Sequence, residues 1–113
     1  MASNWDSWLI YSTSLCIIVC MERSLLYSWD EQKRKANIRK HGLDFGDAAN
    51  VFRGPTFTFE DTRFDYKEQR WITIGLLGQT VVVMVHTESQ NEIHLISMRK
   101  AQKNEQEIFY KNL

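Results

Sequence analysis

A basic segment that contains a histidine is the part of this sequence best suited to chemistry. The segment Lys35–Phe45 concentrates positive charge around Asn37 and His41, although the 14 Lys and Arg residues of the chain are balanced by 14 Asp and Glu residues. Basic side chains bind phosphate, and a neutral histidine can act as acid or base near pH 7. The alternative is a solvated helix whose acidic start and basic end match its dipole.

Two further groups of basic residues lie near the ends of predicted strands. They comprise Arg63, Lys67 and Arg70 around Tyr66, and Arg99, Lys100 and Lys103 after the last predicted strand. A tyrosine among arginines suits stacking on an unpaired nucleic-acid base. The alternative is paired surface charge, because Asp61, Asp65 and Glu68 are close enough in sequence to neutralise the neighbouring arginines.

Other residue types limit the reactions that the sequence suggests. His86 and His94 fall within predicted strands and are expected to be structural, while Glu88 at a strand end could accept a proton. The sequence has no HExxH, P-loop or GxSxG motif and no acidic cluster that would hold a metal. A nuclease made of these residues would need no metal: a base would take the proton of a ribose 2′-hydroxyl while Arg and Lys stabilise the charge at phosphorus.

Local sequence signals predict eight elements that position these residues. Asp30 or Ser28 caps the first helix, Gly42 ends it, and Gly78 centres a hairpin turn. On the first helix Lys33, Asn37 and Lys40 or His41 share one face, whereas Gln32, Ala36 and Leu43 are the expected core contacts. The elements are a strand at Ser24–Trp29, helices at Glu31–His41 and from Asp44 to Phe52, strands at Thr56–Glu60, Arg70–Leu77, Thr80–Thr87 and Glu92–Ser97, and a helix at Lys103–Lys111.

This β-α-α-β-β-β-β-α order predicts an α+β fold with a mainly antiparallel sheet. The 113 residues indicate one domain. The apolar stretch Trp8–Met21 is too short to span a membrane, and its Cys16 and Cys20 are expected to be apolar fillers. It is an arm packed on the domain, a weak export signal, or the product of a start codon chosen upstream of the true one. We favour the last, with residues 1–20 as an appended or misannotated segment and 21–113 as the domain.

Several separated motifs resemble the BrnT toxin family of bacterial type II toxin–antitoxin systems, from about Tyr27 to Tyr110. The family's aromatic-x-W-D-E opening, its N-x-x-K-H-G segment and its I-S-A-R-K-A segment occur in the same order, with Met98 replacing the usual alanine. The matching residues are Tyr27, Trp29, Asp30 and Glu31; Asn37, Lys40, His41 and Gly42; Arg63, Tyr66, Glu68, Arg70 and Trp71; and Ile96, Ser97, Met98, Arg99, Lys100 and Ala101.

The resemblance implies a RelE-like ribonuclease fold and a cytoplasmic protein that cuts RNA to arrest translation and growth. It also implies neutralisation by a cognate BrnA-type antitoxin, through which alone the complex would contact operator DNA. From the residues we expect no membrane partner, no cofactor and no metal. The alternative is a non-catalytic module that uses a basic surface for protein interaction or DNA regulation.

From the residues themselves we assign site roles within this expected activity. His41 is predicted to be the acid or base, with Lys40 beside it, and Glu88 is the reserve base. Arg63, Arg70 and Arg99 are predicted to hold the scissile phosphate. The predicted RNA-binding residues are Lys33, Asn37, Tyr66, Lys100 and Lys103.

Overall fold

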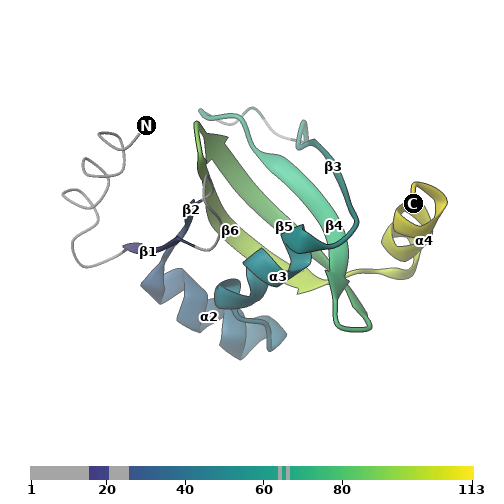
Figure 1. Cartoon of the computed structure of the whole chain (residues 1–113), viewed down its shortest axis with the longest axis horizontal. Coiled ribbons are helices and arrows are strands. Elements are labelled where there is room, and N and C mark those ends of the chain that lie inside the picture. Colours follow the sequence, from purple (N-terminus) through teal and green to yellow (C-terminus); the bar gives the residue numbers. More distant parts are fainter. Residues whose placement is uncertain (1–15, 21–25, 64, 66) are drawn as a thin grey trace.

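A mixed β-sheet forms the centre of the protein in the computed structural model (Figure 1). The structure describes residues 16–20, 26–63, 65 and 67–113. Six strands are hydrogen-bonded in the order β1-β2-β6-β5-β4-β3. The strands are β1 (Cys16–Cys20), β2 (Leu26–Asp30), β3 (Thr56–Glu60), β4 (Trp71–Leu77), β5 (Thr80–Ser89) and β6 (Glu92–Lys100), and the helices are α2 (Glu31–His41), the 3₁₀ turn η1 (Phe45–Asp47), α3 (Ala48–Arg53) and α4 (Lys103–Lys111). The predicted α+β class is confirmed.

Capping residues set the limits of α2 where the sequence predicted them. The Asp30 side chain accepts hydrogen bonds from the backbone N–H groups of Gln32 and Lys33. These bonds satisfy donors that have no partner inside the helix. Gly42 ends the helix at φ 71°, a left-handed conformation that glycine adopts without steric cost.

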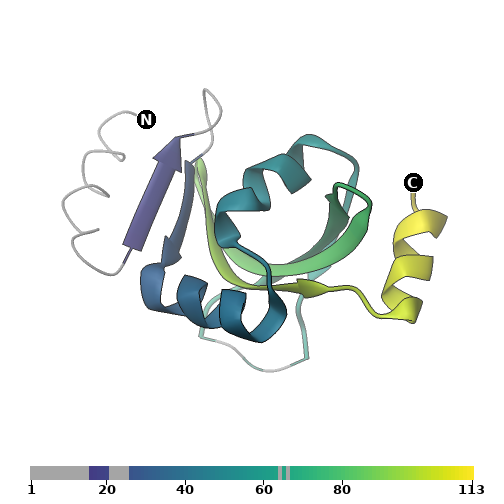
Figure 2. The same cartoon turned by 90° about the horizontal axis from the view of Figure 1, so that it is seen from below.

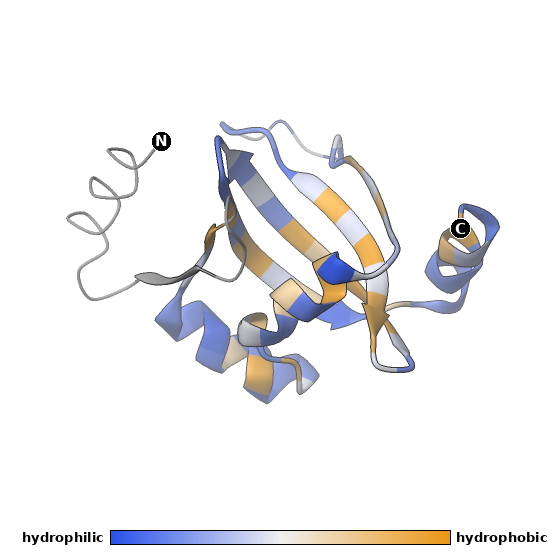
Figure 3. Cartoon of the chain, viewed as in Figure 1, coloured by the Kyte–Doolittle hydropathy of each residue, from blue (hydrophilic) through white to orange (hydrophobic). Residues whose placement is uncertain are grey.

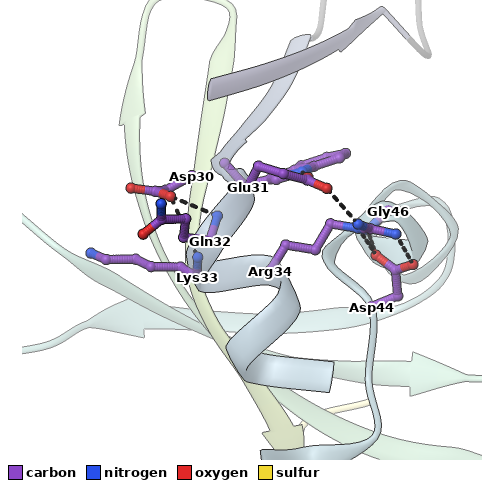
Figure 4. Close-up of polar contacts among 8 residues, drawn as sticks. Asp30, Glu31, Gln32, Lys33, Arg34, Asp44 and Gly46 are labelled. Carbon is purple, nitrogen blue, oxygen red and sulfur yellow. Dashed lines mark hydrogen bonds and ion pairs between the residues drawn. The ribbon is translucent and has the colours of Figure 1, made fainter. Parts of the chain in front are cut away.

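An arginine joins α2 to the segment that follows it (Figure 4). The Arg34 guanidinium donates to Glu31 at 2.7 Å within the helix and to Asp44 at 2.8 Å beyond it. Asp44 in turn accepts from the backbone N–H of Gly46 and so caps η1. These hydrogen bonds fix the direction in which the chain leaves α2, and they lower the pKa of Asp44.

Both predicted hairpins are present, but several element boundaries differ. Gly78, at φ 63°, lies in the β4–β5 turn, and Gln90, at φ 40°, lies in the β5–β6 turn. The predicted second helix begins as the 3₁₀ turn η1 before it continues as α3. Strand β6 continues to Lys100 instead of ending at Ser97, so Arg99 belongs to the sheet and not to a connecting turn.

The sheet also has two features that local patterns did not predict. Strand β2 pairs with β6 in parallel, and β1 pairs with the other edge of β2 in antiparallel fashion. The sheet therefore extends into the residues that sequence analysis assigned to an appended segment. The division into residues 1–20 and 21–113 stays a prediction.

The two faces of the sheet carry two separate cores. Along β5, Val82 and Met84 face η1 and α3, while Val81 and Val83 face α4. Apolar residues alternate with more polar ones along part of β4 (Figure 3), whereas β5 is apolar without interruption from Val81 to Val85, as expected for a strand that is covered on both faces. Glycine at position 75 lets α3 approach the sheet, because an added Cβ would lie 2.6 Å from the Val51 Cγ1 atom.

An asparagine connects α2 to the sheet. Strand β2 pairs with β6 only as far as Leu95, and the Asn37 side chain then bonds to the β6 backbone beyond it. The Asn37 amide donates to the carbonyls of Met98 at 2.8 Å and Leu43 at 3.0 Å, and its oxygen accepts the Met98 N–H at 3.2 Å. The predicted core contacts Gln32 and Ala36 are exposed instead, so that prediction was wrong for both.

We predict that replacing Asn37 will destabilise the fold far more than its small side chain suggests. Asn37→Ala leaves buried backbone groups of Met98 and Leu43 without partners, and each such group costs about 1–3 kcal/mol. Chemical denaturation should therefore show a loss of at least about 2 kcal/mol in the free energy of unfolding. Lys33→Ala, on an exposed position of the same helix, is the control. Equal stability of the two variants would show that the amide bridge contributes little.

Candidate functional site

A cleft of about 420 Å³ lies between α4 and the sheet face that α4 covers. Its floor is apolar and its rim carries two arginines and a glutamate. The register pairs Arg99 with Val83 and Ser97 with Val85, which places the polar residues of β6 on the same face as the floor. The lining residues are Phe59, Arg63, Ile72, Ile74, Val83, Val85, Ser97, Arg99, Asn104, Glu105 and Ile108.

Arg99 forms a two-point ion pair across this cleft. Its guanidinium donates to both carboxylate oxygens of Glu105, at 2.8 and 2.7 Å. Glu105 also accepts the backbone N–H of Gln102 and so completes the capping box at the start of α4. Hydrogen bonding from Arg99 is the main reason that the pKa of Glu105 is lowered, and the same bond raises the pKa of Arg99. The pair therefore stays charged at neutral pH.

Arg63 reaches the same cleft from the segment after β3. Its guanidinium donates to both oxygens of Asp61, at 2.8 and 2.9 Å. The Asp61 carboxylate is completely buried, whereas 58% of the Arg63 side chain is exposed. The positive charge of Arg63 opposes the rise in the pKa of Arg99 and adds to the lowering of the pKa of Glu105. The structure therefore brings together two of the arginines that were predicted to hold a phosphate.

The remaining predicted catalytic residues do not line this cleft. Lys40 and His41 are at the end of α2, and both views place α4 at the other end of the molecule from α2 (Figures 1 and 2). Arg70 lies 3.7 Å from Glu68 on a different surface, and Glu88 is at the end of β5. The pairing of arginines with Asp61 and Glu68, given above as an alternative, is present.

The predicted RNA-binding residues have different surroundings. Lys33, Lys100 and Lys103 are exposed. Asn37 is buried and uses its amide in the contacts with Leu43 and Met98, so we now propose a structural role for it. Tyr66 lies outside the described residues.

A buried polar cluster on β2 and β6 has no signal in the sequence. The register of the parallel pair places Ser28 opposite His94, and the Ser28 hydroxyl lies 2.7 Å from His94 Nδ1 while it hydrogen-bonds to Glu92. Burial raises the pKa of Glu92, an effect that the Ser28 hydrogen bond opposes. Burial also lowers the pKa of His94. These residues are more than 60 positions from Ser28, so only the strand pairing reveals the cluster.

His86 is fully buried on the other face of the sheet. Its Nε2 atom lies 2.7 Å from the Thr73 hydroxyl, and its ring packs edge-on against Phe52. Burial lowers its pKa from 6.5 to about 4, although Glu88 lies 3.4 Å from Nδ1. This environment supports the structural role predicted for His86.

The buried neutral His86 predicts a loss of stability in acid. Because its folded pKa is depressed, the unfolded chain binds a proton below pH 6.5 that the folded chain takes up only near pH 4. The free energy of unfolding should therefore fall over this interval, by on the order of 2–3 kcal/mol from His86 alone.

His86→Gln should remove most of this contribution. The measurement is chemical denaturation of both proteins at pH 8, 6 and 4.5, and the pH 8 values supply each protein's baseline. An identical loss of stability between pH 8 and 4.5 in the two proteins would assign the effect to other groups.

The sequence of this chain matches a known protein family over most of the described fold. A family model described as the ribonuclease toxin, BrnT, of type II toxin–antitoxin systems matches residues 29–105, more than half of the chain. The match runs from β2 to the start of α4 and includes Arg63, Arg99 and Glu105. No curated protein matches the chain. Within the part of the chain that the structure describes, no helix is long and apolar enough to cross a membrane. The chain therefore belongs to the BrnT family of ribonuclease toxins, whose members are parts of type II toxin–antitoxin systems.

Proposed function

We propose that this toxin is an endoribonuclease that cuts RNA in the cleft between α4 and the sheet, arresting translation and growth. The observation that carries the proposal is the convergence of Arg63 and Arg99 on one cleft from two different elements. Planar guanidinium groups match phosphate oxygens in geometry and charge. The apolar floor around Phe59 and Ile108 offers surface to a base or ribose.

The arginines supply electrostatic stabilisation of the charge that develops at phosphorus during in-line attack by the 2′-hydroxyl. We propose that this step proceeds without a divalent cation, because a phosphate bound in the cleft would be held by two guanidinium groups. Cleavage that disappears in EDTA and returns with magnesium would contradict this part of the proposal. The fold is proposed to be RelE-like, and the protein is proposed to act in the cytoplasm.

The antitoxin of the system is proposed to be of the BrnA type and to carry the contact with operator DNA. We propose that it covers the surface around Arg63 and Arg99, while Lys33, Lys100 and Lys103 add exposed charge for RNA. Lys40, which was predicted to belong to the same surface, is at the end of α2 and does not line the cleft. The two arginines do line the cleft. An antitoxin bound there would exclude RNA directly.

We predict that the cleft arginines are needed for both RNA binding and cleavage. Arg63→Ala or Arg99→Ala should lower the single-turnover cleavage rate about 100-fold, the usual effect of removing a preorganised charge-stabilising donor. Filter binding should show weaker RNA affinity for the same proteins. Arg39→Ala removes an exposed arginine from α2 and serves as the control for charge. If all three variants cut RNA equally, cleavage takes place elsewhere.

We also predict that charge reversal of these arginines slows capture by the antitoxin. Arg63→Glu and Arg99→Glu should lower the association rate and reduce its dependence on salt, because steering between opposite charges is lost. Stopped-flow binding at low and high salt measures both effects. Unchanged association at low salt would place the antitoxin on another surface.

A further inference from the structure

We propose that Glu105 is the catalytic base of the cleft, an inference that rests on the proposed RNA cleavage. Neither His41 nor Glu88 lines the cleft, whereas the Glu105 carboxylate lines it together with Arg63 and Arg99. The side chain of Glu105 is 19% exposed, so it is shielded but still accessible to a bound ribose. Sequence analysis did not single this residue out.

The two oxygens of the Glu105 carboxylate have different surroundings. Oε1 accepts the backbone N–H of Gln102 as well as an Arg99 N–H, so the start of α4 holds it in place. Oε2 accepts from Arg99 alone among the described residues, at 2.7 Å. A carboxylate fixed through one oxygen, with the second held only by a cleft arginine, is suited to receive a proton at that second oxygen.

Binding of an RNA phosphate would change the partner of Arg99. Phosphate and carboxylate oxygens both fit the paired donors of a guanidinium group, so they compete for Arg99. When Arg99 turns to the phosphate, Oε2 loses its donor and the carboxylate becomes more basic, since that hydrogen bond is the main cause of its lowered pKa. Arg63 remains beside the phosphate and offsets part of its negative charge. Substrate would thereby activate its own base.

The reaction then balances with groups from this chain, the RNA and water. Glu105 Oε2 takes the proton of the 2′-hydroxyl, whose oxygen forms a bond to phosphorus as the bond from phosphorus to the 5′-oxygen breaks. Water protonates the departing 5′-oxygen, and Glu105 returns its proton to solvent. The products are a 2′,3′-cyclic phosphate and a free 5′-hydroxyl. Arg63 and Arg99 hold the phosphoryl oxygens throughout.

The test is Glu105→Gln in the full chain, with single-turnover cleavage and RNA binding measured on the same preparations. Glutamine retains the oxygen that accepts from the Gln102 N–H and from one Arg99 N–H, but it loses the second acceptor of Arg99, so the melting temperature is measured beside that of the wild type and a modest decrease is expected. The cleavage rate should fall 100-fold or more, within the usual range for loss of a general base. RNA affinity should stay equal or become tighter, because a negative charge leaves the cleft. Glu107→Gln makes the same change at an exposed position of α4 and should leave both unchanged.

The pH dependence of the rate separates a base from a structural residue. The wild-type rate should rise with pH through the pKa of the base in the RNA complex, and Glu105→Gln should lose this rise. Should Glu105→Gln fail to fold, Glu105→Asp replaces it, and a lower rate that still rises with pH is expected. A wild-type rate with a wild-type profile in either variant overturns the proposal and leaves Glu105 as a partner of Arg99 and a cap.

Two further outcomes are distinguishable. If wild-type protein that binds RNA and antitoxin does not cut RNA, the proposed function fails, and the role of Glu105 fails with it. If Glu105→Gln cuts normally while His41→Ala loses both rate and pH dependence, RNA cleavage stands and the base is His41.

Discussion

The bridge from Asn37 to the backbone of Met98 determines how the first helix meets the sheet. Strand β2 leaves β6 after Leu95, and the next part of the β6 edge would lack a partner without the Asn37 amide. One side chain thus replaces a missing strand and holds the end of β6 in sheet geometry. Arg99 follows Met98 directly, so the position of the cleft arginine depends on a contact made from α2. A buried backbone edge needs such a partner because unpaired groups are costly.

How much of the fold the sequence predicts depends on how local each signal is. The caps Asp30 and Gly42 act on neighbouring residues, and α2 has its predicted limits. The hairpin at Gly78 is equally local. The burial of Asn37 was missed because α2 contacts the sheet through an amide and not through an apolar stripe, so spacing along the helix led to Gln32 and Ala36, which are exposed. The parallel pairing that joins Ser28 to His94 depends on residues far apart in the chain, and no short pattern reports it.

The candidate site was predictable only in part, again because its geometry depends on contacts between residues that are far apart in the sequence. Arg63 and Arg99 were identified by residue type, but their meeting in one cleft depends on the β5–β6 register and on where β6 ends. Each cleft arginine also has an acidic partner: Asp61 pairs with Arg63, and Glu105 pairs with Arg99. The resting cleft therefore carries paired charge despite its arginines. In the proposed binding mode RNA displaces a carboxylate from at least one guanidinium, and fewer counterions would be released than a count of basic residues suggests.

The positions of the three histidines favour a carboxylate as the base of the proposed reaction in the cleft. His86 is fully buried behind the sheet, and burial keeps it neutral. His94 uses its Nδ1 atom on Ser28, and His41 is at the end of α2. Among the described residues that line the cleft, none is a histidine. Glu105 beside two arginines is a weak base at rest, because the hydrogen bond from Arg99 lowers its pKa. In the proposed reaction this effect ends when a substrate phosphate competes for Arg99. Coupling of base strength to phosphate binding would, in the proposed reaction, restrict proton abstraction to the RNA-bound state.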